Sequence, residues 1–225
     1  MKKILVLVEG PTEEAFIKQL LVPAFPQSVF VPIIIKTRLI GAQPAKGGSV
    51  TYHTFKRQVQ LLLGDPTASL VTTMIDFQGL GADFPGREKP EPNSSIAKVR
   101  AVESAMQGDL NDGRFLPYLA RHEFEALLFS QPDCIAEVLR RPALQKILQA
   151  IRHQYPQTPE DINDSPATSP SARIESACEQ LYGSPRVFQK RLHGPLIAAR
   201  IGLEKIRIAC PHFDEWMTRL ETLGI

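Results

Sequence analysis

No stretch of this 225-residue sequence approaches the roughly 20 consecutive apolar residues that a helix needs to cross a bilayer. The apolar run after the basic N-terminal residues is too short for a signal peptide, and no small-residue cleavage site follows it. Cysteine is scarce: Cys134, Cys178 and Cys210 are odd in number and lack Cys-x-x-Cys spacing. We therefore expect reduced thiols in a cytoplasmic protein without membrane association, not a disulfide framework or a zinc site.

The sequence also lacks an excess of one charge. Its 26 Lys and Arg residues nearly balance 24 Asp and Glu residues, which leaves a formal net charge of +2. This balance argues against a histone-like basic binder, although it permits a local basic groove. With 43% hydrophobic and 22% charged residues, the composition is that of a globular protein with a sizeable core.

Strand-like and helix-like segments alternate through the first half of the chain. Apolar or β-branched runs at residues 4–8, 29–35, 69–75 and 114–120 predict four strands. Helical spacing predicts helices at 12–22 and 52–63, and from a serine cap at 94 or 95 through 106, with an irregular loop at 77–93. This alternation implies a Rossmann-like α/β fold, with a largely parallel sheet of about four strands flanked by helices.

Strand patterns disappear after residue 131. Helical patterns follow instead at residues 133–139, 143–152, 171–181, 187–200 and 204–223, with a polar, Pro-rich connection at 158–170. We therefore predict an α/β domain at residues 1–131 and an all-helical C-terminal subdomain at residues 132–225.

Acidic residues stand at the ends of three predicted strands: Glu9, Asp76, and the pair Glu123 and Glu125. Parallel strands share a direction, so their carboxyl ends meet at one edge of the sheet, where ligands bind in open α/β folds. Clustered carboxylates repel one another, and a divalent cation such as Mg²⁺ or Mn²⁺ relieves that repulsion. We predict that Glu9, Asp76 and Glu125 bind such a metal for phosphoryl chemistry, with Glu125 preferred over Glu123.

Glu13 has two interpretations. If Gly10 is the N-cap and Pro11 is the first helical residue, Glu13 falls at the third helical position, where an acid stabilises the helix start. Glu13 can equally serve as an outer acid or general base above Glu9. Both roles can hold together, and Glu13 is kept among the predicted catalytic residues.

Three segments together, VEGPTE at residues 8–13, MIDF at 74–77 and HEFEALLF at 122–129, resemble a family of Toprim-like bacterial proteins. That family is similar to the nuclease half of the overcoming-lysogenization-defect (OLD) proteins and is often encoded beside an ABC/AAA-type ATPase in antiphage settings. The resemblance covers most of the chain, and it implies a Toprim fold, Mg²⁺-dependent phosphodiester hydrolysis and an ATPase partner. The chain departs from the Toprim pattern at Gln78, which replaces the second acid of Asp-x-Asp and favours one metal over two.

Cationic side chains are candidates for binding a nucleic-acid backbone. Arg121 can neutralise a phosphate or pair with an acid, and His122 can shuttle protons or be structural. A basic stretch in the helical half includes Arg173, Lys190 and His193, and it is either a nucleic-acid guide or a solvated face. KGGS at residues 46–49 suggests a phosphate-holding turn but lacks the Walker pattern.

Two functions are compatible with these features. The first is a Mg²⁺-dependent nuclease that cuts DNA or RNA as the effector of an antiphage system with a partner ATPase. The second is a non-catalytic Toprim-like module that binds an ATPase and nucleic acid as a sensor or regulator, which Gln78 favours. A phosphoacceptor domain built on Asp76 is disfavoured because the paired acids of receiver domains are missing. Homo-oligomerisation is left open.

Overall fold

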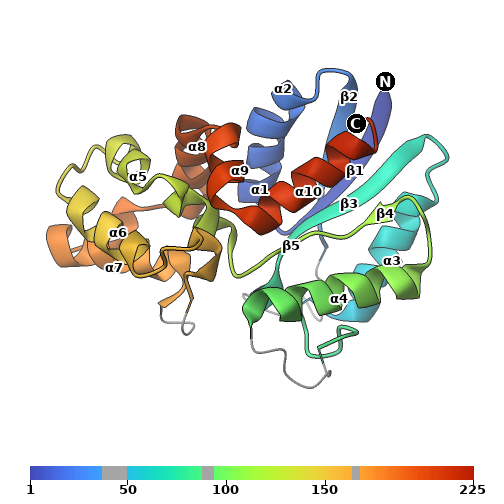
Figure 1. Ribbon diagram of the computed structural model, residues 1–225, viewed down its shortest axis with the longest axis horizontal. Coiled ribbons are helices and arrows are strands. Elements are labelled where there is room, and N and C mark those ends of the chain that lie inside the picture. The colour runs from blue at the N-terminus through green and yellow to red at the C-terminus, as the bar shows by residue number, and fades with distance from the viewer. Residues whose placement is uncertain (37–49, 88–93, 164–167) are drawn as a thin grey trace, which may run out of the picture. The chain divides into compact units, whose positions relative to one another are not determined.

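The computed structural model describes residues 1–36, 50–87, 94–163 and 168–225 (Figure 1). The chain divides into two compact units: Met1–Gly10 with Phe25–Arg121, and Pro11–Ala24 with His122–Ile225. Contacts between residues define these two units. The boundary after residue 131 rests instead on the change in sequence pattern, and it stays a prediction. The KGGS turn at residues 46–49 lies outside the described residues.

A five-stranded parallel sheet forms the centre of the first unit, as the described residues show, and it confirms the predicted α/β class. The strand order is β2-β1-β3-β4, and β5 also pairs with β3. The strands are β1 (Lys2–Val8), β2 (Ser28–Ile34), β3 (Ala68–Asp76), β4 (Phe115–Leu116) and β5 (Leu119–Ala120).

The fourth predicted strand, residues 114–120, is divided into β4 and β5. Pro117 stands between them, and proline has no N–H to donate to a ladder. Thr73 replaces the missing strand bonds with its side chain: Tyr118 N–H donates to Thr73 Oγ1 at 2.9 Å, and that hydroxyl donates to Tyr118 O at 2.7 Å. The sheet edge beside β3 therefore continues past the proline.

Two helices, α3 (Tyr52–Leu63) and α4 (Ser95–Leu110), cover one face of this sheet (Figure 1). Thr51 caps α3, and Ser94 caps α4 by accepting the N–H of Ala97 at 3.3 Å. The shared core contains Phe55 and Val59 of α3, Val99 and Val102 of α4, and Leu5, Leu7, Val71, Ile75 and Leu119 of the strands. The predicted helix at residues 52–63 is confirmed at both ends.

The loop after β3 is described over residues 77–87, where turns and bends predominate, as its glycines and prolines predict. It begins with a short 3₁₀ turn, η2 (Phe77–Gly79). Arg87 then closes the loop by donating to the carbonyl oxygens of Leu80 at 2.5 Å and Gly81 at 3.2 Å, while its guanidinium lies 4.7 Å from the Phe77 ring centroid. These contacts hold the residues that follow Asp76 in a defined path.

The second unit is helical. The predicted helix at 12–22 contains a π-helical turn, and the predicted helices at 187–200 and 204–223 start later or divide, the last of them at Pro211, which begins a new helix. Within the described ranges, every helix is too short or too polar to span a bilayer. The elements are α1 (Pro11–Phe16), η1 (Ile17–Leu21), α2 (Val22–Ala24), η3 (Phe124–Ser130), α5 (Pro132–Val138), α6 (Leu144–His153), η4 (Pro159–Asp161), α7 (Pro170–Tyr182), η6 (Pro185–Val187), α8 (Lys190–Ile201), α9 (Leu203–Ala209) and α10 (Pro211–Thr222).

Aromatic side chains join α1, η3 and α10 in this unit. The Phe16 ring contacts those of Phe124 and Phe213 edge to face, with centroids 5.3 Å and 5.9 Å apart. Helix α8 approaches α1 closely at Gly194, where an added Cβ would lie 3.0 Å from Thr12 Cγ2. The start of α1 is therefore packed against the helical half of the chain.

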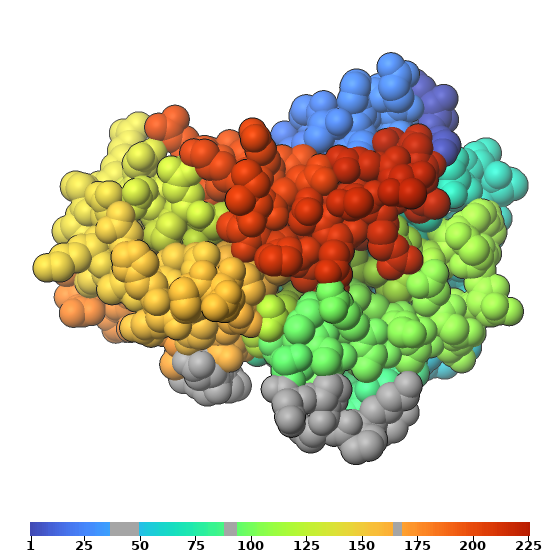
Figure 2. Space-filling model, viewed as in Figure 1, coloured from blue at the N-terminus to red at the C-terminus, as the bar shows by residue number. Residues whose placement is uncertain are grey.

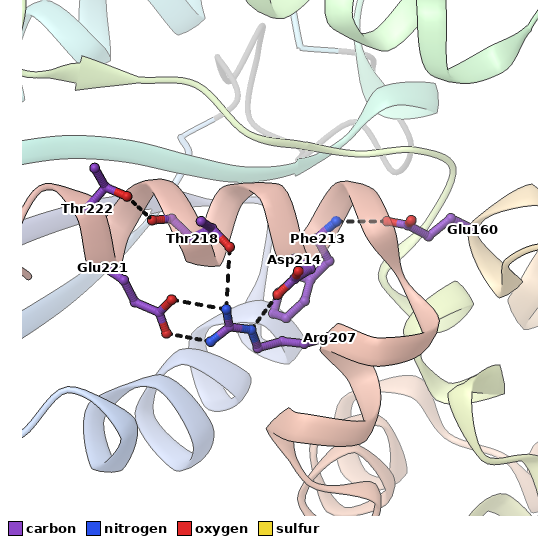
Figure 3. Close-up of polar contacts among 7 residues, drawn as sticks. All are labelled: Glu160, Arg207, Phe213, Asp214, Thr218, Glu221 and Thr222. Atoms are coloured by element: carbon purple, nitrogen blue, oxygen red, sulfur yellow. Dashed lines mark hydrogen bonds and ion pairs between the residues drawn. The ribbon is translucent and has the colours of Figure 1, made fainter.

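Helix α10 is held at its start and along its length by charged groups (Figure 3). The buried Glu160 carboxylate accepts the N–H groups of His212 at 3.0 Å and Phe213 at 3.1 Å. Arg207 of α9 donates to Asp214 at 2.5 Å and forms an ion pair with Glu221. One side of α10 is solvent-exposed, and this helix faces the viewer in red in Figure 2.

Candidate functional site

The strand order of the first unit contains a topological switch point. The chain passes from β1 to β2 on one side, and then to β3 on the other side of β1. In open parallel sheets, ligands bind beyond the carboxyl ends of the two strands that flank such a point. Glu9 follows β1 directly and Asp76 ends β3, so both predicted site residues of this unit stand at the switch point.

Backbone contacts bring Glu9 and Asp76 together. Glu9 N–H donates to Met74 O at 3.2 Å, which extends the β1–β3 ladder by one residue. Asp76 N–H donates to Glu9 Oε2 at 3.0 Å. The Glu9 carboxylate lies against Gly79, where an added Cβ would be 3.1 Å and 3.3 Å from its two oxygens. Both acids are only partly buried, so solvent reaches them.

Gln78 lies within η2 and is exposed. It can offer an amide oxygen to a cation, but without a charge. Among the described residues, no group of three or more His, Cys, Asp or Glu side chains is arranged to hold a metal ion. Glu9 and Asp76 belong to the first unit and Glu125 to the second, and their common metal site stays a prediction.

A separate group of charges lies in the second unit. Lys190, the first residue of α8, has its Nζ 3.5 Å from Glu123 Oε1 and 3.6 Å from Glu125 Oε2. Glu123 Oε2 also accepts the N–H of Ser171 at 3.1 Å, in the first turn of α7. Glu13 stands at the third position of α1 and is buried, and both interpretations of its role stay predictions. Lys190 thus contacts both Glu123, the N-cap of η3, and Glu125 in its first turn.

Glu125 has the most perturbed environment of this group. Glu125 is only 3% exposed, and this burial raises the pKa of its carboxyl group to about 7. The Lys190 ammonium opposes this rise in pKa, whereas the charges of Glu123 and Glu13 add to it. At neutral pH a substantial fraction of Glu125 therefore carries a proton, which makes it a candidate acid or base.

Arg121 and His122 are adjacent in the chain but belong to different units. Arg121 donates Nε–H at 3.0 Å and Nη2–H at 2.7 Å to the Ser95 hydroxyl oxygen at the start of α4. His122 Nδ1 lies 3.2 Å from Asn163 Nδ2. Both residues are buried, 8% exposed each, so neither is an open surface cation.

Two of the cationic residues predicted to bind substrate make local contacts. Arg173 donates to Thr168 O at 2.8 Å and to Tyr155 Oη at 2.6 Å. His193 Nδ1 accepts the N–H of Gln189 at 3.0 Å before α8, and burial lowers the pKa of its ring. These contacts account for both side chains without a ligand, and their binding role stays a prediction.

Sequence reasoning did not single out Ser95 and Gly79 as site residues. Ser95 was considered only as a helix cap, and the cap proves to be Ser94. Gly79 lies in the segment predicted as an irregular loop, residues 77–93. For both residues the only signal in the sequence is a position at or near the end of a helix or strand. Such positions rarely indicate function.

The family model of a domain of unknown function, DUF4276, matches residues 8–221. No curated protein and no solved structure matches the chain. The matched range contains every residue considered above as a candidate for the site.

Proposed function

The chain belongs to the DUF4276 family, a domain of unknown function, and from its site we propose that it is a Mg²⁺- or Mn²⁺-dependent nuclease that hydrolyses phosphodiesters in DNA or RNA. The observation that carries this proposal is the convergence of Glu9 and Asp76 on the switch point between β1 and β3. The resemblance of the sequence to Toprim-like nucleases supplies the substrate class.

The donor set of the first unit suits a hard divalent cation. Glu9 and Asp76 offer carboxylate oxygens, and Gln78 offers an amide oxygen two residues further on. Mg²⁺ is commonly held by one or two carboxylates, several waters and substrate phosphates, so a third carboxylate is not required. When bound, such an ion would supply charge neutralisation and a water of lowered pKa.

The chain's own residues would orient and balance that chemistry. The Asp76 N–H fixes one oxygen of Glu9, and Gly79 leaves room for its carboxylate. Arg121 would neutralise charge on the phosphate. In the second unit, Glu125, whose burial raises its pKa to about 7, can give or accept a proton, and Glu13 is proposed as an outer acid.

The direct test is cleavage of single- and double-stranded DNA and RNA with Mn²⁺, together with Mn²⁺ binding measured by titration calorimetry. We expect Glu9→Gln and Asp76→Asn to lower both cleavage and Mn²⁺ affinity by roughly 100-fold or more, because each removes a charged ligand. Glu14→Gln is the matched control, since that carboxylate pairs with Lys18 on the surface of α1. Wild-type cleavage by either site variant would refute the proposal.

A non-catalytic role as the binding or regulatory partner of an ABC/AAA-type ATPase is the second candidate. It is favoured by Gln78 at the position of an expected acid, and by the lack of a three-carboxylate metal group among the described residues. In both cases we propose a place in an antiphage defence system. An adjacent ATPase gene and its co-purification with the chain, without cleavage of any nucleic acid, would support this second role.

A further inference from the structure

The face of the sheet covered by α3 and α4 carries an arginine, Arg121, at its carboxyl edge in addition to the acid Glu9. Leu7 of β1 and Leu119 of β5 both belong to the core beneath these helices. Side chains alternate along a strand, so Glu9 and Arg121, two residues further on and one residue past the ends of β1 and β5, start on that same face, whereas Asp76, which follows the core residue Ile75, starts on the other face at the strand end. The bonds from Arg121 to Ser95 of α4 agree with this placement.

Strand pairing determines the distance between the backbones of Glu9 and Arg121. Residue Ala120 is in register with Asp76, and β3 lies between β1 and β5. Two strand spacings separate the backbones of β1 and β5, about 9–10 Å. The Glu9 carboxylate and the Arg121 guanidinium are both on long side chains, so they can contact one ligand across the end of β3. A carboxylate-bound cation beside an arginine is the charge arrangement that a phosphate group requires.

Ser95 determines the orientation of that arginine. Its single hydroxyl oxygen accepts both the Nε–H and the Nη2–H of Arg121, at 3.0 Å and 2.7 Å, which fixes one edge of the planar guanidinium. The capping of α4 does not need this hydroxyl, because the neighbouring Ser94 accepts the N–H of Ala97. Ser94 thus caps α4, whereas the neighbouring Ser95 binds Arg121.

We propose that Ser95 is a positioning residue that orients Arg121 as the phosphate-contacting group of the Glu9–Asp76 site. This inference rests on the proposed function, since it assigns a phosphate to that site. A guanidinium held in place before the ligand arrives loses little conformational freedom on binding, which strengthens the contact.

Inorganic phosphate is the probe, and its affinity is measured by titration calorimetry with and without Mn²⁺. We expect Ser95→Ala to weaken phosphate binding by about 10-fold, the effect of removing a group that supports a ligand-contacting side chain. Ser95→Thr keeps the hydroxyl and should restore wild-type affinity. Ser94→Ala should lower the melting temperature through the lost cap, yet leave phosphate affinity unchanged.

Mn²⁺ affinity in the absence of phosphate separates this inference from the proposed function. We expect the three serine variants to bind Mn²⁺ as the wild type does, because Glu9 and Asp76 are unchanged. Wild-type phosphate affinity in Ser95→Ala, or no phosphate binding by the wild type, overturns the role of Ser95 and Arg121. If the wild type does not bind Mn²⁺, the metal site is overturned instead. The phosphate titration without metal then still decides the role of Ser95.

Discussion

At the scale of single residues, the least expected property of this chain is the environment of Glu125. The sequence indicates an acid near the end of a strand, whereas the structure buries it beside Lys190. Because its pKa is raised from 4.5 to about 7, the native state retains a proton that the unfolded chain releases between these two pH values. The contribution of Glu125 to stability is therefore present below about pH 4.5 and lost as the pH rises through 7.

We expect Glu125→Gln to remove this pH dependence. The free energy of unfolding of the wild type should fall between pH 4.5 and pH 8 by an amount on the order of 3 kcal/mol more than that of the variant. Urea denaturation at the two pH values measures the difference. Glu14→Gln, on an exposed ion pair, should keep the wild-type slope. An unchanged slope in Glu125→Gln would mean that another group is responsible.

Gly79 shows how one missing side chain shapes the site. A Cβ at this position would lie 3.1 Å from a Glu9 carboxylate oxygen, so Gly79→Ala should displace Glu9 and lower Mn²⁺ affinity by about 10-fold. Calorimetric titration with Mn²⁺ measures this effect. Gly108→Ala is the control, since a Cβ there meets nothing within 4 Å and replaces glycine inside α4, which should raise stability by up to about 1 kcal/mol. Equal Mn²⁺ affinities in both variants would contradict the role of Gly79.

At the scale of elements, the hydrophobic period predicts most helices and strands, and it fails where side chains from distant segments intervene. The helix at residues 52–63 depends on its own cap and apolar face, and its prediction is confirmed. The strand at residues 114–120 is split because Pro117 cannot donate, and Thr73 of another strand completes the bonding. No local pattern indicates that substitution.

The start of α10 also depends on a distant segment. Glu160 accepts the N–H groups of His212 and Phe213, which have no partner within the helix, while its charge is favoured by the helix dipole. Glu160→Gln retains only one accepting oxygen, so we expect a loss of about 1–3 kcal/mol in the free energy of unfolding. Urea denaturation measures it, with Glu179→Gln on the exposed side of α7 as the control. Equal stability of the two variants would show that water replaces Glu160.

At the scale of the whole molecule, the composition of the two halves and their contacts divide the chain differently. Phe16 lies in the first half of the sequence, yet its ring packs on Phe124 and on Phe213 of α10. Helix α1 therefore belongs to the helical unit, although its sequence position is between two strands of the sheet. A cut after residue 131 would separate Phe213 from Phe16 and Phe124.

We expect the fragment of residues 132–225 to fold poorly by itself, because it lacks Phe16, Phe124 and the rest of α1 and η3. Thermal melting followed by circular dichroism should show a broad transition, in contrast to the cooperative melt of the full chain. A cooperative melt of the fragment would instead establish residues 132–225 as an autonomous domain and support the compositional boundary.

The sequence by itself determined the parallel direction of the strands, and hence that Glu9 and Asp76 would stand at one edge of the sheet. This follows because strand and helix periods are local, and strands joined by helical crossovers must be parallel. Only the tertiary structure decided that β1 and β3 are neighbours, that Gly79 lies against Glu9, and that Ser95 holds Arg121. These contacts join residues far apart in the chain, and they depend on how the elements pack together, which the period of a single segment does not specify.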